Sequence, residues 1–535
     1  MNGLPWTQHL ILLPILLPLL AGAALIPVNE ARHGLKFAVN LVCNLILLAC
    51  AVTLFRFADG GHWPDGLGVY LAANWQAPFG IALLVDRLSA LLLLLTALLS
   101  LAVLVFSYRG WSRIGVHFHS LFLFLLMGIN GAFLTNDLFN LFVFFEVMLA
   151  ASYGLVLHGY NTTRIRAGMQ YIAINLVASL LFLIGLALIY ATTGTLNMAD
   201  LGPRVAALAA DDLALLQVGT VILALAFLTK GAMWPLGFWL PTTYAAASPP
   251  VAAMLVLMTK VGVYAIVRVW PLAFSAGPAA GFGLEALYWG GIATIVFGSL
   301  GILASEEAGR VAGYGAIISS GTLLAIVGYG GPALLGVGLY YLLGATLAMA
   351  AFLLLVGLTE RIRTPGAALL ALTMEAFAIE EKPDEPVGVG IPAAMAFLGL
   401  AFAASALVIT GMPPLSGFVA KFSLFHVLLA VDGPVPWTAW TLIALILCAG
   451  LAAIISLMRF GVRTFWAAGA VQPPSLQLSE AAPISLLLGL CIAMTILAAP
   501  LLDYLQRTAD MLAQPTRYVE RVLGETAVPA PGSVR

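Results

Sequence analysis

Long apolar runs follow one another along most of this chain, and they restrict its possible folds more than any other feature. About 20 apolar residues in a helix cross the hydrocarbon core of a bilayer. About fourteen runs reach that length, near residues 10–28, 36–56, 81–106, 116–134, 138–158, 168–192, 213–240, 250–270, 284–303, 311–329, 333–358, 392–429, 438–460 and 481–505. We therefore predict an all-α, polytopic membrane protein of about fourteen transmembrane helices.

Composition excludes several other classes of protein. Of the 535 residues, 62% are hydrophobic and only 9% are charged, which is not typical of a soluble domain. The formal net charge of −1 provides no basic surface for nucleic acid. The four cysteines lie in apolar runs, without the spacing of a metal site or a disulfide framework; they are Cys43, Cys50, Cys448 and Cys491. We expect no metal and no cofactor, and a location in the cell membrane.

The loops between the runs differ in basic residues, and this difference predicts orientation. Alternate loops, beginning with the one between the first two runs, carry twelve basic residues, whereas the intervening loops carry three. The twelve are Arg32, Lys36, Arg109, Arg113, Arg164, Arg166, Arg310, Arg361, Arg363, Lys382, Arg459 and Arg463, and the three are Arg56, Arg204 and Arg268. Basic loops face the cytoplasm, so both termini should face outward.

One run, at residues 213–240, contains a lysine deep inside it and is followed closely by prolines. Lys230 comes about seventeen residues into the run, and Pro235 and Pro241 follow it. A charge at mid-membrane costs roughly 2.5–3.5 kcal/mol on insertion scales, and proline deletes a backbone donor. Such broken backbone survives in a membrane only where it lines a protein-enclosed cavity. We predict a discontinuous helix at an ion-translocation site.

The run at residues 392–429 is too long for one straight helix, and Pro413 and Pro414 interrupt it. Each interrupted helix is the fourth of a five-helix block, at 116–270 and 284–460. An odd number of helices per block gives consecutive blocks opposite orientations, so we predict two inverted repeats. The predicted division is 1–110 (three helices), 111–275 (first repeat), 276–460 (second repeat) and 461–535 (last helix and tail).

Four ionisable residues lie far inside apolar runs, and we predict that they transfer protons. They are Glu146, Lys230, Lys260 and Lys421. Ionisable groups within a membrane usually mark an ion pathway. In this hypothesis Lys230 holds its proton while the carboxylate of Glu146 is close to it, and when the pair separates Lys230 releases the proton to Lys260.

Three further ionisable residues have weaker positions. Asp86 is followed by Arg87 at the start of a run, where the two are either interfacial anchors or part of the proton path. Asp137 begins a run and is expected to stabilise the N-terminus of that helix. His426 is titratable but does not share a helical face with Lys421. We expect the segment 57–80 to form an interfacial cap. We expect the segment 359–391 to be a charged linker or a contact for a neighbouring subunit.

Several of these segments resemble one known family. They are residues 137–146 (DLFNLFVFFE), 230–241 (KGAMWPLGFWLP), 248–253 (SPPVAA), 260–268 (KVGVYAIVR) and 411–421 (GMPPLSGFVAK). Together they resemble the antiporter-like family of respiratory complex I membrane subunits and Mrp/Pha-type cation/proton antiporters. The short segment after the last run and a lysine at position 421 favour the D-type subunits of Mrp/Pha antiporters. The resemblance implies fourteen helices, inverted repeats and proton-transfer roles for the four deep ionisable residues.

The chain departs from the family pattern in the second repeat. Family members often carry histidine or lysine in the tenth and eleventh helices, where this chain offers only Ser319, Ser320 and Thr346. Ordered water, held by groups such as Ser319 and Thr346, would then have to bridge the path to Lys421. Partner subunits could also meet the deficit.

The resemblance implies a transport subunit rather than an enzyme. It would exchange protons for Na⁺ or K⁺ together with other membrane subunits of the same complex. A proton-pumping subunit of a complex I-type oxidoreductase or a membrane-bound hydrogenase is the alternative. A structural subunit, whose buried charges only hold helices together, is the third possibility. No cluster of carboxylates in the sequence marks a dehydrated Na⁺ site, so the cation is not identified.

Overall fold

The computed structural model describes residues 6–108, 110–159, 161–359, 393–465 and 476–527. In this part of the chain, twelve helices are long and apolar enough to span a bilayer. They are α3 (His33–Asp59), α4 (Arg87–Ser107), α6 (Leu138–Val156), α7 (Thr162–Thr193), α9 (Ala210–Lys230), α11 (Pro249–Ala273), α12 (Leu284–Ala304), α13 (Ala308–Tyr329), α14 (Pro332–Thr359), α16 (Ala393–Thr410), α18 (Trp437–Phe465) and α19 (Leu478–Ile496).

Three shorter apolar helices complete the predicted set of runs: α2 (Leu13–Leu25), α5 (Phe118–Leu134) and α17 (Ser416–Leu429). The predicted polytopic helical fold is confirmed, with nearly every predicted run matched by a helix. The predicted linker at 359–391 lies almost wholly outside the described residues, as do Arg109, Arg361, Arg363 and Lys382.

Both predicted interruptions are present. The first helix stops at Lys230, and the chain resumes helical structure only at α10 (Leu240–Ala246). The second stops at Thr410, and α17 begins at Ser416. Pro235, Pro413 and Pro414 lie within these breaks. Pro241 does not, because it occupies the first turn of α10, where a missing N–H removes no helical hydrogen bond.

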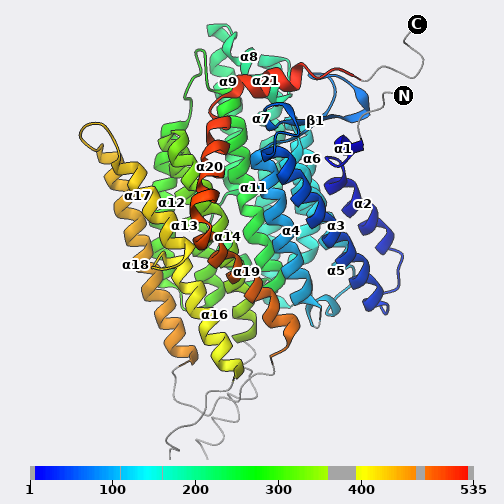
Figure 1. Cartoon of the computed structure of the whole chain (residues 1–535), viewed down its shortest axis with the longest axis vertical. Helices are drawn as coiled ribbons and strands as arrows, with labels where there is room; N and C mark the ends of the chain where they lie inside the picture. Colours follow the sequence, from blue (N-terminus) through cyan, green and yellow to red (C-terminus); the bar gives the residue numbers. More distant parts are fainter. Residues whose placement is uncertain (1–5, 109, 160, 360–392, 466–475, 528–535) are drawn as a thin grey trace, which may run out of the picture.

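One end of the molecule carries most of the short elements. A hairpin of β1 (Gly68–Leu71) and β2 (Ala82–Val85) is antiparallel, with Gly68 opposite Val85. It lies near α8 (Met198–Ala206) and α21 (Pro515–Leu523), at the end of the molecule where the first and last described helices, α1 (Trp6–His9) and α21, are found (Figure 1). The 3-10 turns Pro64–Gly66 and Ala72–Asn74 flank strand β1, and a further described 3-10 turn, Trp111–Arg113, lies between α4 and α5. We predicted that both termini face outward, so we call this end of the molecule the outward end; its orientation in the membrane stays a prediction.

Two predicted helix boundaries are wrong. The run at 81–106 begins as strand β2, and its helix starts only at Arg87. The run at 481–505 divides between α19 and a separate helix, α20 (Ala498–Leu512), whose packing against α14 keeps it in the bundle. Two basic residues that we assigned to loops, Lys36 and Arg268, are buried in α3 and α11.

The centre of the bundle is formed by α11 and α14, which are buried along nearly their whole length. In Figure 1 the helices α2 and α3 lie at one side of these two, and α17 and α18 lie at the other. Outer helices such as α7 expose apolar side chains, among them Leu176 and Leu180, as surfaces in contact with lipid do. Lys260 therefore lies in protein rather than in lipid. The division into four segments stays a prediction, and the two interrupted helices fall within its two middle segments.

Candidate functional site

Glu146 lies on α6, about two turns from the start of that helix, and it is partly exposed. The hydroxyl of Ser179 on α7 donates a hydrogen bond to its carboxylate. The same hydroxyl also lies 3.0 Å from the backbone oxygen of Asn175, one turn earlier on α7. The carboxylate is therefore held by a neutral hydroxyl on the neighbouring helix.

Lys230 is the last residue of α9, and only 7% of its surface is exposed. Its Nζ donates to Oδ1 of Asn175 over 2.7 Å, and the amide nitrogen of Asn175 donates to the backbone oxygen of Tyr171. Among the described residues no ion pair joins Lys230 to Glu146. The direct pair that we hypothesised is thus replaced by a bridge through Asn175 and Ser179.

Our sequence analysis missed these two α7 residues. Asn175 and Ser179 are polar residues four positions apart in an apolar run, and this spacing places them on one face of a helix. The spacing was therefore a usable signal. It was weak, because an isolated Ser or Thr in a membrane helix often bonds only to its own backbone.

The C-terminal end of α9 packs closely against the middle of α11, so the first two lysines are on adjacent helices. A Cβ placed on Gly262 would lie 2.7 Å from the backbone nitrogen of Gly231 and 2.9 Å from Cβ of Lys230. Only glycine permits so close an approach of the backbones. Gly262 is two residues beyond Lys260 on α11, so the two residues point to different faces of that helix: Gly262 packs against α9, and the Lys260 side chain meets α13.

Lys260 is 1% exposed, and its neighbours are hydroxyl groups. Its Nζ donates to Oγ of Ser319 over 2.8 Å, and Oγ of Ser320 lies at 3.5 Å. Both serines are on α13. We predicted Ser319 as an accessory residue, and the structure places it in direct contact with this lysine.

Lys421 follows the second interruption, on the second turn of α17. Its Nζ donates to the backbone oxygen of Thr410 over 2.6 Å, the last residue of α16. The side chain runs so close to Gly411 that a Cβ there would lie 2.7 Å from its Cε. The lysine thus satisfies a carbonyl that the broken helix leaves without its normal partner.

A cavity lies between Ser319 and Lys421. Its polar lining comes from the side chains of Ser319, Thr322, Tyr341, Ser416 and Lys421. It offers about 40 Å³ to the centres of water molecules, and one water needs roughly 10–15 Å³ on that measure. The cavity therefore has room for about three waters.

Thr346, which we also predicted as a bridging group, does not line this cavity. Its hydroxyl donates to the backbone oxygen of Leu342 over 2.6 Å, one turn earlier on α14. A threonine hydroxyl in a helix can make this local bond without any other partner. The expected bridge therefore has Ser319 at one end, and hydroxyl groups other than Thr346 along its length.

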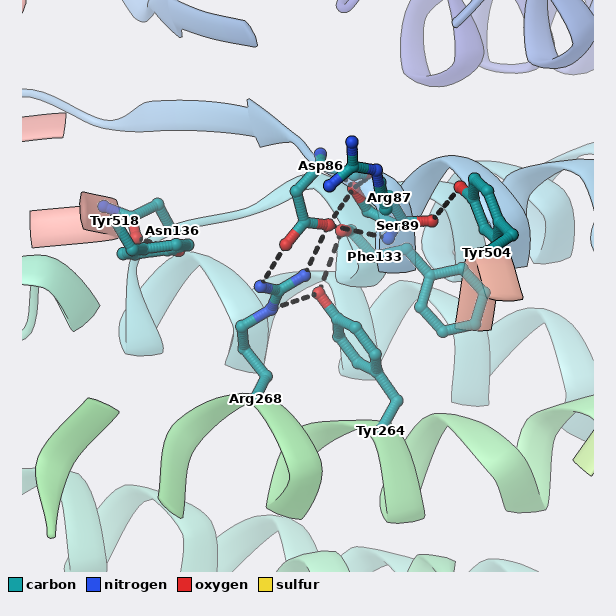
Figure 2. A network of polar contacts seen from close by, with 9 residues as sticks. All are labelled: Asp86, Arg87, Ser89, Phe133, Asn136, Tyr264, Arg268, Tyr504 and Tyr518. Atoms are coloured by element: carbon teal, nitrogen blue, oxygen red, sulfur yellow. Dashed lines mark hydrogen bonds and ion pairs between the residues drawn. The ribbon is translucent and has the colours of Figure 1, made fainter. Parts of the chain in front are cut away.

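Asp86 belongs to a different, outward cluster, shown in Figure 2. It is fully buried, and its carboxylate caps α4 by accepting from the backbone nitrogen of Ser89. Arg268 binds the two carboxylate oxygens over 2.5 and 2.8 Å and also donates to the hydroxyl of Tyr264. Arg87, the sequence neighbour of Asp86, pairs instead with Asp59.

The C-terminal helices close over this cluster. The Tyr518 ring of α21 lies against the Arg268 guanidinium, and its hydroxyl donates to Asn136 (Figure 2). On α20, the Tyr504 hydroxyl donates to the backbone oxygen of Arg87. Burial raises the pKa of Asp86, which precedes α4, but Arg268 outweighs burial and holds that pKa below its usual range.

The remaining two predicted residues lie apart from the deep lysines. Asp137 caps α6 by accepting from the backbone nitrogen of Asn140 over 2.8 Å, as we expected. Burial raises its pKa, and the hydrogen bonds from that turn oppose this effect. His426 is exposed in the last turn of α17 and does not join the buried groups.

Comparison with known proteins decides the family. The model for the transmembrane region of NADH:quinone oxidoreductase and Mrp antiporter subunits matches residues 135–448, more than half of this chain. The chain belongs to this family. The matched region contains both interrupted helices and all four deep ionisable residues, so the resemblance that we inferred from the motifs is confirmed.

Members of the NADH:quinone oxidoreductase/Mrp antiporter family match this chain along nearly its whole length. This chain is 51% identical over 528 residues to the D subunit of a probable K⁺/H⁺ antiporter of Rhizobium meliloti (strain 1021). The match covers 97% of this chain and 98% of that protein. It is 34% identical over 526 residues to the D subunit of the Na⁺/H⁺ antiporter of Alkalihalophilus pseudofirmus, covering 97% and 100%.

Solved structures agree. A chain of the Mrp complex from Dietzia sp. DQ12-45-1b superposes with a TM-score of 0.81 at 27% identity, covering 97% of this chain and all of that one. A chain of an archaeal membrane-bound sulfane sulfur reductase gives the same TM-score at 24% identity. The second likeness shows the shared fold alone.

Proposed function

We propose that this chain is the D-type, proton-translocating subunit of a multisubunit monovalent cation/proton antiporter of the cell membrane. The observation that carries the proposal is the series of Glu146, Lys230, Lys260 and Lys421: Lys230 and Lys260 are buried in the bundle, and Lys230 and Lys421 lie at the two interrupted helices. Similarity to two antiporter D subunits, at 51% and 34% identity over 97% of this chain, supports the same function. The partners are the other membrane subunits of the antiporter.

In the first repeat, protons move between Glu146 and Lys230. Asn175 and Ser179 lie between these two groups and hold each of them with a neutral partner. A neutral partner accepts a hydrogen bond from the lysine without a full opposing charge, so the lysine can give up its proton. A shift of either side chain across α7 changes which partner it meets and thereby moves the proton.

The next transfer is from Lys230 to Lys260, across the close contact of α9 and α11 at Gly262. Ser319 then provides a hydroxyl in contact with Lys260. Lys421, at the second interruption, is the last basic group of the series.

K⁺ is the cation to test first, because the more similar of the two D subunits named above is that of a probable K⁺/H⁺ antiporter. The test uses inverted membrane vesicles from antiporter-deficient cells that express the complete set of subunits. We expect K⁺ or Na⁺ to dissipate a preformed pH gradient in vesicles with the wild-type chain. Vesicles with Lys230→Ala should show no such activity despite normal amounts of complex, and full activity of that variant would reject the proposal.

A further inference from the structure

The four deep ionisable residues do not form a continuous series of contacts, because a gap separates Lys260 from Lys421. Lys260 contacts Ser319, and Lys421 contacts the end of α16, but no contact between described residues joins these two groups. The space between them is the cavity lined by Ser319, Thr322, Tyr341, Ser416 and Lys421. Any proton that passes from Lys260 to Lys421 by the shortest protein-enclosed route has to cross it.

The cavity contains a polar group that requires a ligand. Ser416 is 0% exposed, and its Oγ has no nitrogen or oxygen partner among the described residues. The Cys491 thiol beside it is only a weak donor. An unsatisfied buried hydroxyl costs about 1–3 kcal/mol, and a water bound in a polar cavity of this size removes that cost. The lining and the volume together indicate ordered water.

Tyr341 is placed to use that water. It projects from α14 into the cavity, and its hydroxyl lies beside those of Ser319 and Thr322 on α13. A phenolic hydroxyl both donates and accepts hydrogen bonds, as serine and threonine hydroxyls do. Tyr341 therefore extends the hydroxyl contact of Lys260 across the cavity from α13 and α14, two helices that carry neither a histidine nor a lysine.

We propose that Tyr341 is a proton-relay residue, joined by Thr322, Ser416 and cavity water, on the path from Lys260 to Lys421. The inference rests on the proposed antiport function and adds a residue to it. The ammonium of Lys260 gives a proton to Ser319, which passes its own proton to Tyr341. The phenol accepts that proton as it donates its own to water, and the neutral amine of Lys421 takes up the last proton.

This relay conserves protons and charge. One N–H bond breaks at Lys260 and one forms at Lys421, while each hydroxyl and each water ends neutral. Tyrosine does not have to ionise, because it gains and loses a proton in the same transfer. The relay has the same composition in either direction, as a reversible antiporter requires.

The test compares two neighbouring tyrosines of α14. Tyr341→Phe removes the cavity hydroxyl and keeps the ring. Tyr340→Phe is the matched control, since the Tyr340 hydroxyl donates to the backbone oxygen of Met494 and does not line the cavity. Both variants are made in the complete antiporter, and cation-dependent proton transport is measured in vesicles with equal amounts of assembled complex.

We expect Tyr341→Phe to slow transport by at least about tenfold, within the range typical of a lost proton-transfer group. We also expect a larger ratio of rates in H₂O and D₂O, an effect that loss of packing alone would not produce. Tyr340→Phe should transport at the wild-type rate. Ser416→Ala serves as a second variant should Tyr341→Phe assemble poorly, and it should slow transport with the same isotope effect.

Wild-type rates and isotope ratios in both Tyr341→Phe and Ser416→Ala would overturn the relay. The outcome for Lys230→Ala keeps this separate from the proposed function. If Lys230→Ala is inactive while the cavity variants are fully active, the antiport function stands and the relay does not. If Lys230→Ala is itself active, the proposed function fails.

Discussion

Two sets of buried charges in this protein are stabilised in opposite ways. At the outward end, Asp86 and Arg268 neutralise each other through two hydrogen bonds and are enclosed by aromatic side chains. At mid-depth, Lys230 and Lys260 are as deeply buried, but their contacts are an amide oxygen and serine hydroxyls. Burial alone therefore does not distinguish a structural charge from a functional one.

The partner of a buried charge determines whether that charge is fixed in place or can be lost with a proton. A bidentate arginine–carboxylate pair fixes geometry and keeps both groups ionised. It joins α4 and α11, and its neighbour Tyr518 adds α21, so it locks the outward end together. A lysine whose hydrogen-bond partners are neutral has no counter-charge in direct contact to hold its proton, and arginine in its place could not release one. We interpret the first set as a lock and the second as a pathway.

Breaking the lock should have the largest effect. Asp86→Asn leaves the buried Arg268 without its counter-charge, which typically costs about 3–5 kcal/mol. We expect a severe loss of assembled complex, measured by the amount of the chain recovered from membranes with its partners. Asp86→Leu combined with Arg268→Met should recover part of the loss, because it removes both charges.

The pair of Asp86 and Arg268 also predicts that acid lowers the stability of the folded protein. The pKa of Asp86 is lowered in the folded protein, so its stabilising contribution is present at neutral pH and is lost as the pH falls through that lowered pKa.

An exposed pair provides the control for Asp86→Asn: Glu306→Gln, which removes the partner of Arg463 at the surface, should leave the amount of complex unchanged. Equal losses for the exposed and the buried variant would refute the distinction.

Giving Lys230 a counter-charge should have a smaller and different effect. Asn175→Asp places a carboxylate where Nζ now meets an amide oxygen at 2.7 Å. The pathway lysine would then resemble Arg268 of the lock. We expect normal assembly, transport slowed by about tenfold at neutral pH for each 1.4 kcal/mol by which the pair favours the charged lysine, and a transport optimum at higher pH. An unchanged rate and pH profile would show that the neutral partner is not needed.

The fold was predictable from the sequence because the bilayer imposes a simple requirement. Backbone in hydrocarbon must satisfy its own hydrogen bonds, so length and apolar composition identify helices almost without tertiary information. The prolines at 235, 413 and 414 identified the interruptions for the same reason. The hairpin at 68–85 escaped, because its second strand, Ala82–Val85, is apolar and continues directly into α4.

The site was predictable only in part. The four deep ionisable residues stand out because ionisable side chains are rare far inside apolar runs. Their partners do not, because pairing is set by packing between helices distant in sequence: Arg268 and Asp86 are 182 positions apart. Asn175 and Tyr341 carry no charge, so composition gives them no special weight. Asp86 and Arg87 were expected to be interfacial anchors or part of the proton path, whereas the structure pairs Asp86 with Arg268 and Arg87 with Asp59.

The central claim is that Lys230 acts by releasing a proton rather than by holding helices together. Lys230→Arg tests it most directly, since arginine keeps the positive charge and the donor but is not deprotonated in proteins. The complete complex carrying this variant would be reconstituted in vesicles and assayed for cation-driven proton movement. We predict normal assembly with loss of transport as complete as in Lys230→Ala, and transport at the wild-type rate would contradict the claim.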